Sequence, residues 1–137
     1  MALVADYLVI RDTAFTLYAD PEKKRAENFG VPLPAGFRAD RRAVLGFVVD
    51  PRPSPGVRLQ VFGGPDDDPK RVPLINEYRF MSEALRAVWE AFVPQKVGWT
   101  VGTRTLEFIA WPHGSTGSPD TGSLSISDIV LWFKRDA

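Results

Sequence analysis

The sequence contains no cysteine and only one histidine among its 137 residues. Without cysteine, disulfide bridges, cysteine-ligated zinc and thiol catalysis are excluded. A single histidine also excludes a multi-histidine metal site and leaves one imidazole for acid–base catalysis. These absences remove several classes of enzyme and metalloprotein, and we expect the protein to need no cofactor.

An excess of basic charge is missing too, because seventeen lysine and arginine residues balance seventeen aspartate and glutamate residues. Proteins that bind nucleic acid normally carry a basic excess or a basic stripe, since neutralising phosphates supplies most of their affinity. The short basic runs at 23–25 and 38–42 are interleaved with acidic residues, as is typical of solvated segments of mixed charge. The sequence therefore argues against a nucleic-acid partner.

Long apolar runs are also missing. No segment approaches the ~20 apolar residues of a membrane-spanning helix. Residues 1–6 lack the basic start of a Sec-type signal peptide, and their apolar run ends at Asp6. We therefore expect the protein to fold in the cytoplasm and not to insert into a membrane. Its final location stays open.

What the sequence does have is a series of short apolar segments between turns rich in glycine and proline. The length is that of a typical single domain, so residues 1–137 are expected to form one domain. Segment 57–62 alternates apolar and polar residues, as a half-buried strand does. Segment 43–49 is apolar on both faces, as expected for a central strand covered on both sides.

Three segments need separate interpretation. Residues 81–93 carry apolar residues at helical spacing but also fit a strand; we favour the strand and leave one short helix open. Residues 19–42 contain several prolines and glycines and are predicted to form a long connection pinned by its apolar residues. In the last strand, 124–134, the apolar phase changes, which indicates a β-bulge near Ser127 and Asp128.

About eight such strands predict an all-β fold of two packed antiparallel sheets, a β-sandwich or jelly roll. Segments 102–108 and 123–132 resemble the closing strands of galactose-binding-like jelly-roll modules, and 57–63 is similar to the strand before them. Arg104 stands where that family often has asparagine, and Gly63-Gly64 replaces its Asn-Gly. The resemblance covers roughly half of the chain and implies a non-catalytic carbohydrate-binding or adhesion module, with no particular ligand.

Asp66, Asp67 and Asp68 form the most obvious cluster of ligands for a hard cation. Three consecutive carboxylates cannot all point at one ion, and the spaced pattern of an EF-hand is absent. We interpret the cluster as a solvated acidic turn and predict no metal site.

Catalytic groupings can be written down but are poorly supported. His113 and Asp120 lie with two serines in one glycine-rich loop, which would not hold a Ser-His-Asp triad in productive geometry. Glu77, Glu90 and Glu107 lie in predicted strands, where outer carboxylates are usually solvated rather than paired for glycoside hydrolysis. We predict that the protein is not an enzyme.

The four tryptophans are the remaining clue. Trp89 and Trp132 lie in strands among apolar residues, which predicts core packing. Trp99 and Trp111 lie at strand ends beside turns, where a ring can stack on a sugar, contact a protein or close the core. The predicted ligand contacts are Trp99, Trp111, His113 and Asp120.

Taken together, these patterns predict a non-enzymatic recognition module whose favoured ligand is a carbohydrate. The alternative is a structural or assembly protein, for example a component of a phage-tail-like particle. In that case the same surface would contact identical or different subunits, so a homo-oligomer is possible. The expected partner is accordingly a glycan or another protein.

Overall fold

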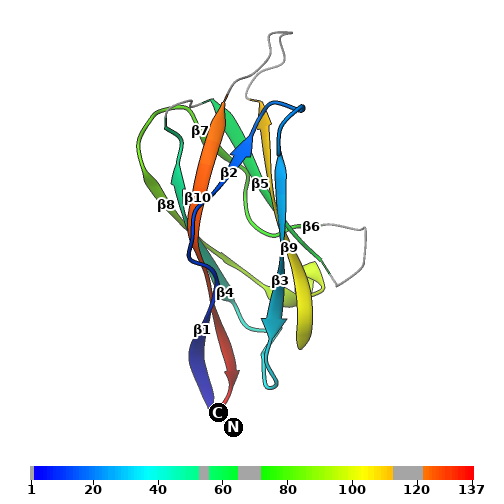
Figure 1. The fold of residues 1–137 in the computed structure, drawn as a ribbon. Helices are drawn as coiled ribbons and strands as arrows, with labels where there is room; N and C mark the ends of the chain where they lie inside the picture. The colour runs from blue at the N-terminus through cyan, green and yellow to red at the C-terminus, as the bar shows by residue number, and fades with distance from the viewer. Residues whose placement is uncertain (1, 53–55, 65–71, 113–121) are drawn as a thin grey trace.

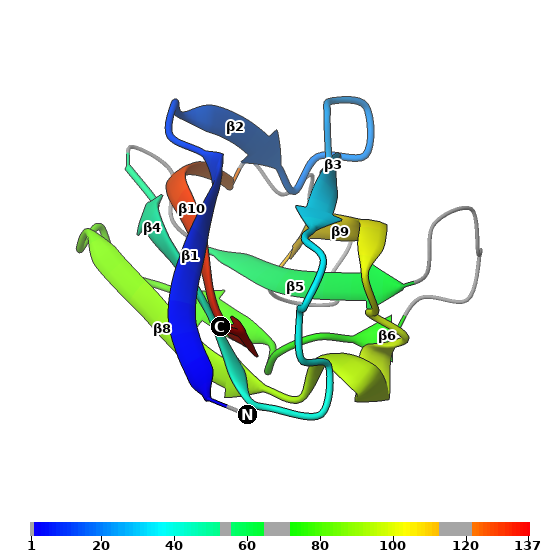
Figure 2. The ribbon, with the colours of Figure 1, turned by 90° about the horizontal axis from the view of Figure 1, so that it is seen from below.

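The computed structural model describes residues 2–52, 56–64, 72–112 and 122–137. Its strands form two antiparallel sheets that face each other, with the core between them (Figures 1 and 2). The first sheet has the order β1-β10-β4-β8, with β2 also on β10; the second has the order β3-β9-β5-β6, with β7 also on β5. The strands are β1 (Leu3–Arg11), β2 (Phe15–Tyr18), β3 (Ala26–Leu33), β4 (Ala43–Asp50), β5 (Val57–Gly64), β6 (Val72–Pro73), β7 (Tyr78–Phe80), β8 (Arg86–Phe92), β9 (Gly102–Pro112) and β10 (Ser123–Asp136).

This architecture confirms the predicted all-β sandwich, with ten strands where the sequence indicated about eight. The one helical element in the described residues is the 3₁₀ helix η1 (Pro94–Val97), which follows β8. No helix in the described part of the chain is long and apolar enough to cross a membrane.

Strand β3 corrects the prediction that residues 19–42 form one long connection. Residues Ala26–Leu33 pair continuously with β9 and with no other strand, so β3 lies at the edge of its sheet. At an edge the missing N–H of Pro32 need not interrupt the hydrogen-bond ladder. Buried and exposed residues alternate along the end of this strand, with Val31 and Leu33 buried on either side of an exposed Pro32. The corresponding apolar residues were visible in the sequence. The prolines and glycines around it concealed that pattern.

Residues 81–93, for which the sequence allowed a strand or a short helix, contain β8. The strand pairs with β4 from Arg86 to Phe92, so the favoured interpretation is confirmed. Within β8, Val88 and Phe92 are buried and Trp89 is exposed. Pairing with a neighbouring strand decides the conformation here, since tertiary context overrides a local preference that is nearly balanced.

The bulge predicted near Ser127 and Asp128 is present in β10. The register between β10 and β4 shifts between Ser127 and Val130, and Asp128 has a φ of 55°. The buried residues of β10 therefore change from even-numbered before the bulge to odd-numbered after it. One consequence is that Trp132, an even-numbered residue after the bulge, lies on the outer side of the sheet.

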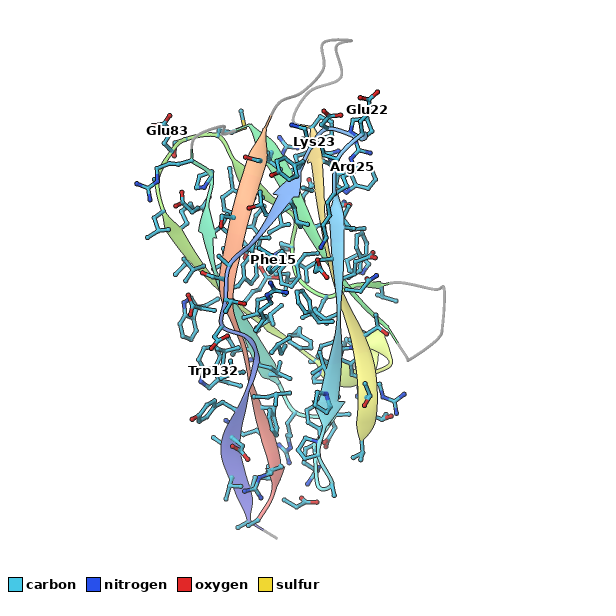
Figure 3. All side chains as sticks on the ribbon, viewed as in Figure 1. Phe15, Glu22, Lys23, Arg25, Glu83 and Trp132 are labelled. Carbon is cyan, nitrogen blue, oxygen red and sulfur yellow. The ribbon has the colours of Figure 1, made fainter. Side chains whose placement is uncertain are left out.

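Aromatic rings join the two sheets across the core. Three rings contact one another: Phe15 of β2, Phe29 of β3 and Phe108 of β9. The ring centroid of Phe15 lies 5.3 Å from that of Phe29 and 6.3 Å from that of Phe108, and the last two are 6.0 Å apart. Phe47 of β4 lies 5.1 Å from Phe108. Figure 3 shows Phe15 between the sheets and Trp132 on the far side of the first sheet.

Glu90 of β8 fastens the two sheets together along one edge. Its carboxylate accepts hydrogen bonds from the backbone N–H of Asn76 (2.5 Å), the Asn76 side-chain amide (3.0 Å) and the Tyr78 hydroxyl (2.5 Å). Tyr78 begins β7 of the second sheet, so these bonds connect β8 to it. Burial raises the pKa of Tyr78 to about 12, and the hydrogen bond to Glu90 adds to this effect.

Candidate functional site

The outer side of the first sheet, which faces away from the second sheet, is apolar across its centre. In β4, Leu45, Phe47 and Val49 are buried, so the alternate residues point outward. Strand pairing aligns the outward residues of β1, β10 and β8 with those of β4. The outward residues at the centre of this face are Tyr7, Val9, Val44, Gly46, Val48, Ala87, Trp89, Ala91, Val130 and Trp132.

Two tryptophans stack on each other on this face. The rings of Trp89 and Trp132 have centroids 4.3 Å apart and planes inclined by 24°. Gly46, on the strand between them, makes this possible: a Cβ there would lie 2.7 Å from Cζ3 of Trp132 and 3.4 Å from Cδ2 of Trp89. Trp89 is nevertheless 61% exposed. The stack is therefore held over the central strand while much of one indole stays open to solvent.

Tyr7 extends the stack across β1. It pairs directly with Trp132 in the antiparallel ladder, which places the two side chains next to each other on the same face. Its ring is 63% exposed. We call Tyr7, Trp132 and Trp89 the aromatic row; it runs across the strands from β1 to β8, roughly 14 Å at the usual spacing of neighbouring strands.

A hollow of about 570 Å³ lies beside the aromatic row on the same face. Its floor is apolar, and three cationic side chains and one carboxylate surround it. We call it the basic hollow, and its lining residues are Leu3, Asp40, Arg41, Arg42, Val44, Ala91 and Lys134. The face thus combines open aromatic rings with nearby hydrogen-bond donors, which is the usual composition of a small-molecule site.

Trp111 lies on the outer side of the second sheet, and its ring is partly covered. The guanidinium carbon of Arg25 is 4.9 Å from the ring centroid. That guanidinium is fixed by hydrogen bonds to the carbonyl oxygen of Ala19, at 2.8 and 3.2 Å. Arg58, opposite Trp111 in the ladder, donates to the Pro112 carbonyl at 3.2 Å. The surroundings of this tryptophan are therefore occupied by contacts within the protein.

Of the four sequence-predicted contacts, Trp99 and Trp111 fall within the described residues. Trp99 is completely buried and packs edge-on against Phe92, with centroids 5.6 Å apart, so it presents no face to a ligand at the surface. This matches the alternative in which its ring closes the core. Trp111 is half-buried under Arg25. His113 and Asp120 lie outside the described residues.

The prediction that Trp89 and Trp132 pack in the core is wrong. Both lie on the outer face of the first sheet, where they form most of the aromatic row. Their apolar neighbours in sequence suggested burial, but a strand that is apolar on both faces does not reveal which face the second sheet covers. The pairing of Trp89 opposite Gly46 was a usable signal, although it needs the strand register.

The described part of the chain offers few side chains for binding a metal ion or for acid catalysis. Among those residues, no group of three or more histidine, cysteine, aspartate or glutamate side chains could hold a metal ion. Glu77 binds Arg58 at 2.9 Å, and Glu90 is used by Asn76 and Tyr78. The acidic cluster at 66–68 lies outside the described residues.

No family model and no curated protein sequence matches the chain. Solved structures do match. The xylan-binding module CBM15 superposes with a TM-score of 0.58 and 12% identity, over 99% of this chain and 100% of that one. The chain has the fold of jelly-roll carbohydrate-binding modules. A structure of a CBM4 module agrees, with a TM-score of 0.52 and 14% identity over 92% of this chain and 74% of that one.

The same fold also occurs in a virus. A chain from infectious bursal disease virus, Gx strain, has a TM-score of 0.59 and 12% identity over 97% of this chain. This chain spans only 32% of the viral one. At such identities the likeness concerns the fold alone, and the resemblance to galactose-binding-like jelly rolls seen in the sequence is confirmed at that level.

Proposed function

We propose that the protein is a non-enzymatic carbohydrate-binding module that holds a glycan against the aromatic row. The observation that carries the proposal is the Trp89–Trp132 stack, in which Trp89 keeps 61% of its surface exposed on a sheet face that is apolar across its centre. Large apolar patches on soluble proteins usually mark binding surfaces.

Aromatic rings suit sugars because one face of a pyranose ring presents C–H groups, which pack against the electron-rich face of an indole or phenol. The rigidity of the row favours such packing. Gly46 and the stacking contact fix the Trp132 and Trp89 rings before any ligand arrives, so less rotamer freedom is lost on binding. The open ring of Tyr7 would add a further contact along the same line.

Fold and site chemistry point in the same direction. One of the modules with this fold is described as xylan-binding. The aromatic row consists of two indoles and one phenol and holds no carboxylate, imidazole or amine, which supports binding rather than acid–base catalysis. Trp111, one of the contacts predicted from the sequence, is a second candidate contact on the outer side of the other sheet.

Affinity electrophoresis or calorimetry on a panel of soluble polysaccharides tests the proposal with two matched variants. Trp89→Ala should weaken binding about tenfold or more while lowering the thermal midpoint by only a few degrees, because its ring is mostly exposed. Trp111→Ala is the control on the opposite sheet and should leave binding intact. Equal affinity of wild type and Trp89→Ala for every glycan, or no glycan bound at all, would overturn the proposal.

One observation favours the alternative, an assembly protein. Val9, which pairs with Val130 on the same face, is 50% exposed, and Leu85, just before β8, is 61% exposed, so the apolar surface is wider than a sugar chain needs. Sedimentation over a range of protein concentrations separates the two functions. A stable oligomer that dissociates in Trp89→Ala would favour assembly, whereas a monomer that binds glycan favours the module.

A further inference from the structure

The basic hollow has more cationic than anionic side chains among its lining residues. Arg41, Arg42 and Lys134 line it, and Asp40 is the one carboxylate among its lining residues. Arg42 and Lys134 are both exposed and form no ion pair within the described residues. Across the whole sequence positive and negative charges balance, so this local excess is a feature of the face and not of the composition.

The single carboxylate of the hollow is already neutralised from outside it. Arg38, which does not line the hollow, donates to both oxygens of Asp40 at 3.0 and 2.9 Å and also to Asp136 at 3.2 Å. The hydrogen bonds with Arg38 lower the pKa of Asp40 and those with Asp40 and Asp136 raise the pKa of Arg38. Arg41 reaches Asp40 only at 3.9 Å. The cations of the hollow therefore keep their hydrogen-bonding capacity for another anion.

These cations lie one step along the strands from the aromatic row. Lys134 is two residues beyond Trp132 on β10 and faces the same side. Arg42 immediately precedes β4 and is two residues before Val44, which pairs directly with Trp132. Two residues along a strand measure roughly 7 Å. The Trp132 ring itself leans toward Gly46, so a glycan packed on the row and continuing past Val44 would bring a substituent of its next sugar within reach of both cations.

The shape of the hollow also suits a charged substituent. Leu3, Val44 and Ala91 provide an apolar floor, which lowers the local dielectric constant and strengthens charge pairing at the rim. The planar guanidinium of an arginine binds carboxylate or sulfate oxygens in pairs, with fixed geometry. The lysine adds a mobile donor that accepts several ligand positions.

We propose that the face formed by the aromatic row and the basic hollow selects acidic glycans, with a carboxylate or sulfate of the sugar bound by Arg42 and Lys134. This rests on the proposed carbohydrate-binding function and adds the class of glycan. The shared chemistry is an oxyanion attached to a sugar ring, and it distinguishes this surface from one that reads only hydroxyl groups.

The test uses pairs of polysaccharides that differ only in charge. Polygalacturonic acid is compared with its methyl ester, and dextran sulfate with dextran, by calorimetry at low and moderate salt. Wild type should bind one acidic member about tenfold or more tightly than its neutral counterpart, the effect expected of one charge-assisted hydrogen bond. The preference should decrease with salt, since the site is open to solvent. The pair that shows it distinguishes carboxylate from sulfate.

Two double variants with the same change in net charge complete the experiment. Arg42→Gln/Lys134→Gln should abolish the acidic preference, so that the acidic and the neutral glycan of a pair bind with equal affinity. Lys23→Gln/Arg79→Gln, which removes two exposed cations away from this face, should keep the preference.

Each outcome separates the two proposals. Equal binding of acidic and neutral glycans, or a preference that survives in Arg42→Gln/Lys134→Gln, overturns the acidic selectivity and leaves a module for neutral glycans. A preference lost equally in both double variants shows general charge attraction and also overturns it. If no polysaccharide binds, the proposed function itself is wrong, and the selectivity is wrong with it.

Discussion

Two glycines on central strands each make room for tryptophan, with opposite results. Inside the sandwich, a Cβ at Gly63 of β5 would lie 3.2 Å from Nε1 of Trp99, whose ring is completely buried. On the outer side, a Cβ at Gly46 of β4 would lie 2.7 Å from Trp132, whose ring stacks on the exposed Trp89. The first arrangement fills the core. The second holds rings in place where the fold does not need to cover them, which is the property expected of a recognition surface.

The largest expected effect comes from removing the buried ring. Trp99→Ala truncates a completely buried indole packed on Phe92 and should lower the free energy of unfolding by about 3–5 kcal/mol. Trp89→Ala removes a ring that is 61% exposed and should cost only about 1 kcal/mol, mainly through the lost stacking. Urea denaturation measures both. Similar losses in the two variants would show that Trp89 serves stability, and the contrast between the regions would fail.

A smaller loss of stability is expected at Glu90, the residue next to Trp89 on β8. Trp89 points outward, whereas Glu90 binds Asn76 and Tyr78. Glu90→Ala leaves these donors without their acceptor and should cost about 1–3 kcal/mol, with no change in glycan affinity.

The pH dependence of this contact has a defined sign. Because the folded-state pKa of Tyr78 is raised to about 12 from the ordinary 10.0, its neutral form is favoured by folding. The corresponding stability is fully present below pH 10 and is lost as the pH rises toward 12. Denaturation of wild type between these limits should show the loss, and Tyr78→Phe should show less of it. A profile unchanged by Tyr78→Phe would assign the alkaline loss to other groups.

Much of the fold followed from the sequence, because strand periodicity and turn residues are local properties. The bulge at Ser127–Asp128 was visible as a change of phase in β10. Strand β3 was missed, since tolerance of Pro32 depends on an edge position that only the assembled sheet defines. Local patterns also could not sort the tryptophans: burial depends on which face of a sheet is covered.

The double-sided apolar pattern of residues 43–49 has a further meaning in the structure. It predicted a strand covered on both sides, yet among the described residues the second sheet covers only one. The outward residues Val44 and Val48 remain half-buried beside the aromatic row. An apolar face that the fold leaves open is explained most simply if a ligand or partner covers it.

The glycines themselves offer the next test. Gly46→Ala should force the Trp132 ring aside, weakening the stack and the glycan affinity, at a modest cost in stability because a surface ring can move. Gly63→Ala would meet Leu74 at 2.7 Å within the core and should cost about 1–3 kcal/mol without affecting the outer face directly. Gly30→Ala is the comparison on the exposed edge strand β3, where the added Cβ would meet a Thr103 methyl at 3.3 Å, a tight contact that a small shift of that side chain relieves. Tryptophan fluorescence and calorimetry measure both properties, and unchanged binding in Gly46→Ala would argue against a preorganised row.

The smallest expected effect concerns Trp111, whose exposure lies between that of the buried Trp99 and that of the open Trp89. Arg25 covers its ring at 4.9 Å, and Arg25 is itself fixed by the Ala19 carbonyl. Arg25→Gln removes this cation–π contact, which is worth about 0.5–1 kcal/mol at an exposed site. If the aromatic row binds the glycan, uncovering Trp111 should leave affinity unchanged within experimental error. Tighter binding in Arg25→Gln, abolished again in Arg25→Gln/Trp111→Ala, would move the site to the second sheet, where the sequence first indicated it.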